Sequence, residues 1–414
     1  MDIILNSPSV KSQIRAISSK SEAHRYLICA ALSDCMSEII CTDTNADIEA
    51  TISCLAALGA SITRKNNSLI VEPISKIPER PMLDCNESGS TLRFLLPLSC
   101  ALNAEAGFIM RGRLASRPLS PLYELLESGG IKLSEQGKSP LFTCGRLSSG
   151  EYEIEANVSS QFISGLLFAL AVCEGESSLK LTGKIESMPY IEMTLNSLCR
   201  FDADIEFESE QGIFKIKGKK KLTSSKIQNV GGDWSNAAFF LSAGAIGKKE
   251  ITILGLEENS AQGDQRIIEI LAKMGAQISQ KCGNITVYPS KLCGIDIDAS
   301  QIPDLVPILA VVASVAEGKT TIFNASRLKL KESDRIQSVC SMLNSLGANI
   351  TPTDDGMVIW GKEKLVGGIT DSFNDHRIAM SAAIASLICE SSVKITNFEA
   401  INKSYPTFLE NFEQ

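Results

Sequence analysis

The sequence repeats one pattern at an almost constant interval. An apolar helical run ending in Gly-Ala or a close variant, followed by an apolar strand, occurs as LAALGASIT, LLESGGIKL, LCRFDADIEF, LAKMGAQIS and LNSLGANIT. The markers Gly59, Gly129, Asp202, Gly275 and Gly347 lie 70 to 73 residues apart. One copy would be unremarkable in an α/β protein, but five copies at this spacing indicate a true structural repeat. A sixth copy would end beyond residue 414, so we expect the N-terminal segment to complete it.

The length of the repeat predicts the architecture. Units of this size are too long for a solenoid and large enough for a helix pair with several strands. Six units would form two domains of three, and 414 residues suit two domains of about 200 residues each. Glycine at four of the five helix ends fits a left-handed C-cap, and alternation as in GIFKIKG or NITVYP fits strands. We expect one join near GKKKLTSSKIQNVGGDW, where charge and glycine interrupt the pattern, and the other near ISSKS.

Composition narrows the class of protein. The formal net charge of -8 argues against a nucleic-acid binder, because neutralising phosphates requires a basic surface. The 13 cysteines are odd in number and show no Cys-x-x-Cys or other metal spacing, which favours a reduced chain. The start MDIILNSPSVKSQIRAISS lacks the basic region and apolar core of a signal peptide, and no later run is long enough to span a bilayer. We therefore expect an unexported, cytoplasmic protein without membrane or nucleic-acid partners.

Polar clusters precede six apolar helical runs. They are SSKSEAHR, NESGST, VSSQ, GGDWSN, KESDR and NDHR. Helix starts offer free backbone N-H groups and a partial positive charge, so they attract phosphate and carboxylate. For any one cluster a simple N-cap is the plainer interpretation. Capping does not explain the cations Lys20, Arg25, Arg93, Arg117, Arg335 and Arg377, since positive charge is unfavourable there, and an anionic ligand would remove this penalty.

The stretch SRLKLKESDR places three cations at every second position. If residues 326–331 form a strand, Arg327, Lys329 and Lys331 lie on one side of it, where they repel one another. Such a group inside an acidic protein predicts a local anion site.

The clusters belong to a longer series of motifs. SKSEAHR, SGSTLR, SRPL, VSSQF, SMPYIEMTLN, NSAQGD, IPDLVP, KESDR, NDHRIAM and KSYP follow one another over residues 20–406. In this order they resemble the motifs of the 5-enolpyruvylshikimate-3-phosphate synthase family. The resemblance implies an α/β fold, a two-domain inside-out α/β barrel with three βαβαββ repeats in each domain. It places residues 1–18 and 232–414 in enolpyruvyl transferase domain I, residues 19–231 in domain II, and the active site in the inter-domain cleft.

The family transfers the enolpyruvyl group of phosphoenolpyruvate to the 5-hydroxyl of shikimate 3-phosphate and releases phosphate. Both substrates are anionic, so the resemblance explains the clustered cations. It assigns shikimate 3-phosphate to Ser21, Arg25, Ser159, Ser160, Gln161, Ser187, Tyr190, Asp304, Arg327 and Lys331. It assigns phosphoenolpyruvate to Lys20, Gly89, Arg117, Gln161, Arg335, Arg377 and Lys403. Catalysis would rest on Asp304 for the hydroxyl proton and Glu332 for the carbon, with Lys20, Lys403 and His376 assisting.

Plainer roles remain open for several of these residues. Asp304 could cap a helix, Glu332 could pair with Arg335 at i,i+3, His376 could make a structural hydrogen bond, and Tyr190 could pack in the core. The resemblance implies no metal or other cofactor, and we expect a monomer. Two alternative functions are an enolpyruvyl transferase acting on UDP-N-acetylglucosamine and a catalytically silent repeat scaffold.

Overall fold

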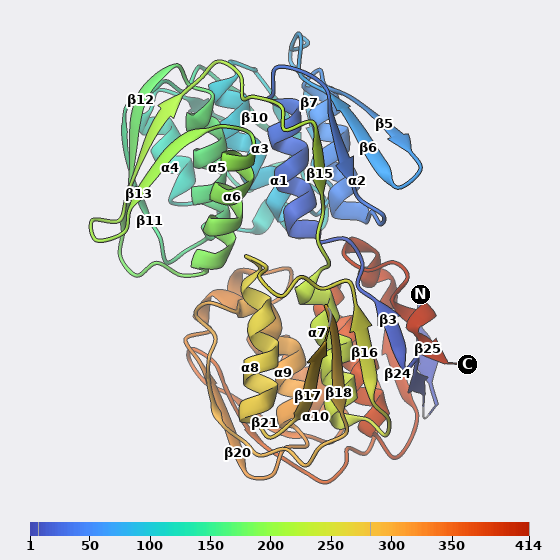
Figure 1. Cartoon of the computed structure of the whole chain (residues 1–414). Coiled ribbons are helices and arrows are strands. Elements are labelled where there is room, and N and C mark those ends of the chain that lie inside the picture. Colours follow the sequence, from blue (N-terminus) through green and yellow to red (C-terminus); the bar gives the residue numbers. More distant parts are fainter. Residues whose placement is uncertain (7, 282, 414) are drawn as a thin grey trace. The chain divides into compact units, whose positions relative to one another are not determined.

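The computed structural model describes residues 1–6, 8–281 and 283–413. The chain forms two compact units, one made of Met1–Ile17 and Gly231–Gln414, the other of Ser18–Val230 (Figure 1). The two crossings between the units lie within the stretches ISSKS and GKKKLTSSKIQNVGGDW. Each unit has its own hydrophobic core.

The unit Ser18–Val230 contains three four-stranded sheets with the same topology. In each sheet the first two strands are parallel and the others pair antiparallel. The first sheet is β15 (Ile227–Asn229), β4 (Ser37–Ile40), β6 (Ser68–Glu72) and β5 (Ser61–Lys65). The second is β7 (Met82–Asp84), β8 (Gly107–Ile109), β10 (Leu141–Cys144) and β9 (Lys132–Leu133). The third is β11 (Glu151–Glu155), β12 (Gly175–Thr182), β14 (Ile213–Gly218) and β13 (Asp204–Glu208).

Helices fill the inside of this unit and sheets form its outside (Figure 1). The inner helices α1 (Lys20–Ala31), α3 (Gly89–Ala101) and α5 (Ser160–Ala171) are buried around most of their circumference. The second helix of each repeat is α2 (Ala46–Ala57), α4 (Leu122–Ser128) or α6 (Met188–Arg200), and η1 (Leu114–Ser116) is a short 3-10 turn. A helix that is apolar on all sides must be enclosed, which explains the inside-out arrangement.

The unit that contains both termini repeats this plan. Its sheets are β3 (Gln13–Arg15), β16 (Ile251–Leu254), β18 (Asn284–Tyr288) and β17 (Gln277–Lys281), then β19 (Asp296–Asp298), β20 (Lys319–Phe323), β22 (Met357–Trp360) and β21 (Asn349–Pro352). The third has β23 (Gly368–Asp371), β24 (Val393–Thr396) and β1 (Ile3–Leu5). Strand β1 pairs antiparallel with β24, so the N-terminal segment completes the sixth copy, as predicted. Strands β2 (Ser9–Val10) and β25 (Phe412–Glu413) form a small separate sheet.

The inner helices of this second unit are also enclosed. They are α7 (Trp234–Ile246), α9 (Val306–Ala313) and α11 (His376–Ala385), and they contact one another. Every residue of α9 and of α11 is buried. The second helices are α8 (Ile267–Lys273) and α10 (Arg335–Ser345). Short 3-10 turns are η2 (Gly263–Arg266), η3 (Pro303–Leu305), η4 (Ser326–Leu330), η5 (Ser386–Ile388), η6 (Phe398–Lys403) and η7 (Phe408–Asn411).

The five repeated motifs end the second helix of each repeat, namely α2, α4, α6, α8 and α10. The left-handed residues there are Gly59, Gly130, Asp202, Gly275 and Gly347, with φ of 102°, 84°, 57°, 104° and 91°. In the second copy this role falls to Gly130, because the predicted marker Gly129 has φ of -76°. Aspartate tolerates the left-handed region better than most residues, which explains the exception at Asp202.

The strand predicted for residues 326–331 is wrong, because Ser326–Leu330 forms the 3-10 turn η4. Strand β20 ends at Phe323, and Asn324 then takes a left-handed φ of 54°. A helix with three residues per turn distributes alternate side chains around its axis instead of along one side. The cations therefore diverge: Arg327 donates to the carbonyl of Ser300, Lys329 to that of Asp354, and Lys331 to the carboxylate of Asp304.

Among the helices of residues 1–6, 8–281 and 283–413, none combines the length and the apolar character that crossing a membrane requires.

The helix-end glycines allow a paired test of strain against crowding. Gly130 has φ of 84° and open space where a Cβ would lie, so Gly130→Ala should cost only the left-handed strain, about 1 kcal/mol. At Gly59 a Cβ would lie 2.2 Å from the carbonyl oxygen of Lys76. We expect Gly59→Ala to cost about 3 kcal/mol in urea unfolding, because backbone must also move. Equal losses in the two variants would contradict this account.

Candidate active site

The six polar clusters do begin helices, and each is also a cap. Helices α1, α3, α5, α7, α10 and α11 start within the predicted stretches. In every case the side chain before the first helical residue accepts a backbone N-H bond. These residues are Ser19, Ser88, Ser159, Asp233, Asp334 and Asp375. The capping interpretation is therefore confirmed, and the cations beside the caps need a separate explanation.

Arg335 lies at the centre of a buried cluster of carboxylates. Its side chain is 1% exposed, and its Nε donates to Asp375 Oδ2 at 2.8 Å. Nη1 donates to Asp304 Oδ1 at 2.8 Å, and Nη2 donates to Glu332 Oε2 at 2.7 Å. Burial by itself lowers the pKa of Arg335, but Asp375, Glu332 and Asp304 raise it above its ordinary value. The guanidinium thus stays charged and fixes three carboxylates around it.

Two further cations contact Asp304. Lys331 Nζ lies 3.3 Å from Asp304 Oδ1, and Arg377 Nη2 lies 3.5 Å from Asp304 Oδ2. Burial lowers the pKa of Lys331, Asp304 opposes that shift, and Arg335 adds to it. The position before η3 is occupied by Ile302 and that before α9 by Leu305, with no side-chain cap bond at either. Asp304 is thus an ion-pair centre, whereas Glu332 does pair with Arg335 at i,i+3.

The remaining predicted residues of this unit lie on neighbouring turns. Arg377 Nη1 donates to the carbonyl of Asp304 at 3.1 Å, and Nη2 donates to Ser235 Oγ at 2.7 Å. His376, the first residue of α11, is 3% exposed, with Nδ1 3.9 Å from Asp375 Oδ1. Lys403, at the end of η6, donates to the carbonyl of Asn374 at 2.7 Å. The structure therefore groups Asp304, Lys331, Glu332, Arg335 and Arg377 through direct contacts.

In the unit Ser18–Val230, Arg25 joins the start of α1 to α6. Its Nε donates to Thr194 Oγ1 at 2.9 Å, Nη1 to the carbonyl of Ser21 at 2.7 Å, and Nη2 to that of Tyr190 at 2.8 Å. The guanidinium also lies over the ring of Phe94, 5.1 Å from its centroid. Burial lowers the pKa of Arg25 to about 10. Arg25 thus positions Ser21 and Tyr190, two residues predicted to bind the same substrate.

Gly89 is the first residue of α3 and lies against two guanidinium groups. A Cβ at this position would be 2.8 Å from Arg117 Nη1 and 2.9 Å from Arg93 Nη1. Gln161, on the first turn of α5, accepts from Arg93 Nη1 and donates to Ser90 Oγ, both at 2.9 Å. The starts of α3 and α5 are therefore linked by a polar contact, with Arg117 beside the first backbone N-H of α3.

Three predicted serines lie at helix starts in this unit. Ser159 caps α5 by accepting from the N-H of Gln161 at 3.3 Å, and Ser160 follows as a buried first residue. Ser187 precedes α6 in the left-handed conformation, with φ of 55°, and is 2% exposed. A serine held at positive φ is uncommon, which indicates that the surrounding structure fixes this backbone.

Sequence reasoning missed carboxylates that accompany the predicted residues within each unit. Asp375 lies inside the NDHR cluster, but only the neighbouring His376 and Arg377 were assigned a role. Its position directly before a helix was the sequence signal that could have identified it. Asp47 bonds Lys20 across 27 residues, and no motif pointed to it. Asp264, in NSAQGD, is 3% exposed, and burial together with the nearby charge of Asp304 raises its pKa to about 6.

The raised pKa of Asp264 predicts a pH-dependent stability. The ionised carboxylate is less favourable in the folded than in the unfolded chain, where its pKa is near 3.8. The folded state therefore loses stability as the pH rises from about 4 to about 6, by at most about 3 kcal/mol. We expect Asp264→Asn to melt above the wild type at pH 7 and to approach it near pH 4. Asp296→Asn, at an exposed site, is the control, and parallel curves for wild type and Asp264→Asn would refute the prediction.

The chain was also compared with known proteins. It matches the family model described as EPSP synthase (3-phosphoshikimate 1-carboxyvinyltransferase) over residues 5–412. It is 43% identical over 412 residues to the 3-phosphoshikimate 1-carboxyvinyltransferase of Clostridium kluyveri, covering 99% of this chain and 96% of the relative. The protein of the same name from Clostridium acetobutylicum is 44% identical over 416 residues, with coverage of 99% and 96%.

A solved structure gives the same result at the level of the fold. The EPSP synthase from Acinetobacter baumannii aligns with a TM-score of 0.80 at 28% identity, covering 99% of this chain and 96% of that one. Its fold, like that of this chain, is the inside-out α/β arrangement that the family resemblance implied. From its full-length sequence match and its relatives, this chain belongs to the EPSP synthase family.

Proposed function

We propose that this chain transfers the enolpyruvyl group of phosphoenolpyruvate to the 5-hydroxyl of shikimate 3-phosphate and releases inorganic phosphate. The enzyme is then a 3-phosphoshikimate 1-carboxyvinyltransferase of the pathway to chorismate and the aromatic amino acids, as the names of its relatives indicate. The observation that carries the proposal is the cluster in which Lys331, Arg335 and Arg377 contact Asp304 while Glu332 pairs with Arg335. It combines cations for anionic substrates with two carboxylates for proton transfer.

The charges of the substrates explain the number of cations. Each substrate carries one carboxylate and one phosphate, so together they bring about six negative charges. Phosphoenolpyruvate would be bound by Lys20, the N-H of Gly89, Arg117, Gln161, Arg335, Arg377 and Lys403. Shikimate 3-phosphate would be bound by Ser21, Arg25, Ser159, Ser160, Gln161, Ser187, Tyr190, Asp304, Arg327 and Lys331. The helix-start N-H groups at Ser159 and Ser160 suit its phosphate.

The reaction needs a base and an acid that act in sequence. Asp304 takes the proton of the 5-hydroxyl as its oxygen bonds to the central carbon of phosphoenolpyruvate, and Glu332 protonates the methylene carbon. The tetrahedral ketal phosphate then loses a proton from its new methyl group and expels phosphate, which restores the double bond. Lys20, Lys403 and His376 assist by holding the phosphate or carrying protons. Arg335 holds both carboxylates in place throughout.

We also propose that the enzyme acts as a cytoplasmic monomer. All the cysteines that the structure describes carry free thiols, as expected in a reducing compartment. Sedimentation of the purified protein at several concentrations tests the oligomeric state.

A phosphate-release assay tests the function and both carboxylates together. Wild-type protein should release phosphate only when both substrates are present, and shikimate 3-phosphate should not be replaceable by UDP-N-acetylglucosamine. Asp304→Asn and Glu332→Gln should each lower kcat about 10²- to 10⁴-fold, the usual contribution of general acid-base catalysis. Glu363→Gln, at an exposed site, is the charge-matched control. No release by the wild type would refute the function, whereas wild-type rates in both carboxylate variants would refute the assigned roles only.

A further inference from the structure

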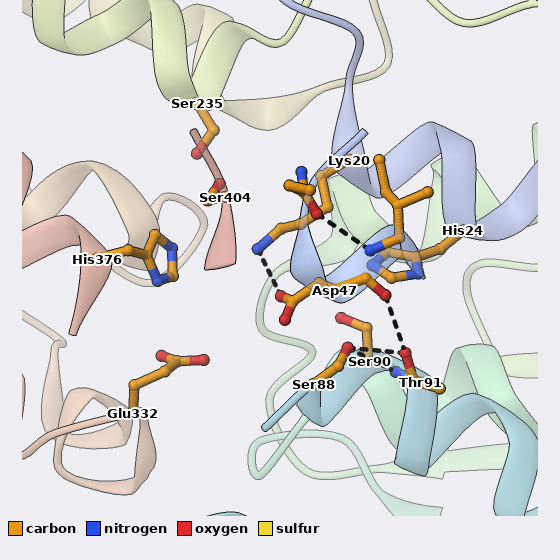
Figure 2. Close-up of polar contacts among 12 residues, drawn as sticks. Lys20, His24, Asp47, Ser88, Ser90, Thr91, Ser235, Glu332, His376 and Ser404 are labelled. Atoms are coloured by element: carbon orange, nitrogen blue, oxygen red, sulfur yellow. Dashed lines mark hydrogen bonds and ion pairs between the residues drawn. The ribbon is translucent and has the colours of Figure 1, made fainter. Parts of the chain in front are cut away.

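Lys20 has an unusual position for a cation. It is the first residue of α1, where the partial positive charge of the helix start disfavours an ammonium group, and its side chain is only 14% exposed. Its Nζ lies 2.9 Å from Oδ2 of Asp47, which is 15% exposed (Figure 2). Asp47 is in the first turn of α2, where a negative charge is favourable. The pair therefore offsets an unfavourable charge on one helix with a favourable charge on another.

A second contact joins the same two helices one turn further on. His24 Nδ1 lies 2.7 Å from Thr51 Oγ1, and these residues follow Lys20 and Asp47 by four positions on α1 and α2. Residues four apart lie on the same face of a helix. The two contacts are thus successive rungs between the same faces, and they fix the rotation and the height of α1 against α2.

Thr91, on the first turn of α3, connects both rungs to the helix that begins at Gly89. Its Oγ1 lies 2.7 Å from Thr51 Oγ1. The same hydroxyl can donate to Ser88 Oγ at 2.8 Å or to the carbonyl of Asp47 at 3.5 Å (Figure 2). A hydroxyl has one proton, so when Thr91 donates to either of these acceptors, Thr51 is the donor to Thr91. In that arrangement Thr51 accepts from the Nδ1-H of His24. Burial followed by the nearby charge of Lys20 lowers the pKa of His24 well below 6.5.

We propose that Asp47 is a positioning residue that holds the ammonium group of Lys20 where the anionic substrate binds. The contacts of Thr91, Thr51 and His24 keep the start of α1, with Lys20, at a fixed position relative to the start of α3, with Gly89. This inference rests on the proposed function, which gives Lys20 and Gly89 their substrate. Asp47 touches Lys20 and does not itself react. Asp47 affects the reaction by setting the position of the Lys20 ammonium group. A displacement of a catalytic group by about 1 Å can reduce turnover about 10²-fold.

A double-mutant cycle tests whether Asp47 acts through Lys20. We expect Asp47→Asn to lower kcat about 10- to 100-fold, with a smaller change in the KM for either substrate. In the Lys20→Ala background, adding Asp47→Asn should change kcat less than about twofold, because the group it positions is gone. Glu49→Gln is the matched control, since it removes a carboxylate and an ion pair with Arg64 from the same helix turn. The proposal would be overturned if the double variant lost kcat by the product of the two single losses. Wild-type kcat in Asp47→Asn would overturn it as well.

A second readout does not depend on catalysis. The rate at which Lys20 is acylated by an amine-reactive reagent, followed by mass spectrometry, should rise several-fold in Asp47→Asn and stay at the wild-type value in Glu49→Gln. An unchanged rate in Asp47→Asn would overturn the positioning role even in a protein that released no phosphate. If Lys20 is acylated faster in Asp47→Asn but the wild type releases no phosphate, the proposed function is refuted, whereas the contact between Asp47 and Lys20 is supported.

A conservative variant keeps the test open if Asp47→Asn does not fold. Asp47→Glu retains the charge at the start of α2 but moves the carboxylate by one methylene group. We expect it to fold and to lose at least fivefold in kcat, with thermal unfolding monitored alongside. Wild-type kcat in this variant would contradict the proposal, because the length of the side chain would then not matter.

Discussion

The enclosure of the inner helices is the constraint on which the rest of the structure depends. Helices α9 and α11 are buried at every residue, and α1, α3, α5 and α7 at nearly all of theirs. An apolar interior cannot hold charged groups along such helices without partners. Helix ends are the favourable places for polar groups, because free N-H groups and caps are available there. This is why many of the candidate residues, such as Lys20, Gly89, Ser160, Arg335 and Arg377, lie in the first turn of a helix.

Charges at these ends occur in compensated groups. The sequence suggested cations whose charge is neutralised only when an anionic ligand binds. The chain instead supplies carboxylates of its own, with Asp47 at Lys20 and three carboxylates around Arg335. Buried ion pairs lose much of their attraction to desolvation, so they contribute little to stability. Removing one partner is costly, because it leaves a buried charge alone. We interpret the pairs as a means of keeping cations charged and oriented before a substrate binds.

Much of the fold was predictable because it is written in local patterns. The helix-end glycines, the strands after them and the six helix starts each depend on residues that are close in sequence. Local patterns also misled in two places. Alternating cations at Arg327, Lys329 and Lys331 suggested a strand, but strand β20 ends at Phe323 and Ser326–Leu330 forms a 3-10 turn. In GG, either glycine could end α4, and only the backbone shows that Gly130 does.

The sequence alone determined the repeat, which follows from its spacing along the chain, and the family with its motif residues, which follow from the resemblance of the ordered motifs. Only the tertiary structure decided which charges meet. Asp375 reaches Arg335 across 40 residues and Asp47 reaches Lys20 across 27, in contacts that depend on how separate helices pack. An ion pair forms according to distance in space, and no periodicity along a chain encodes the distance between two helix starts.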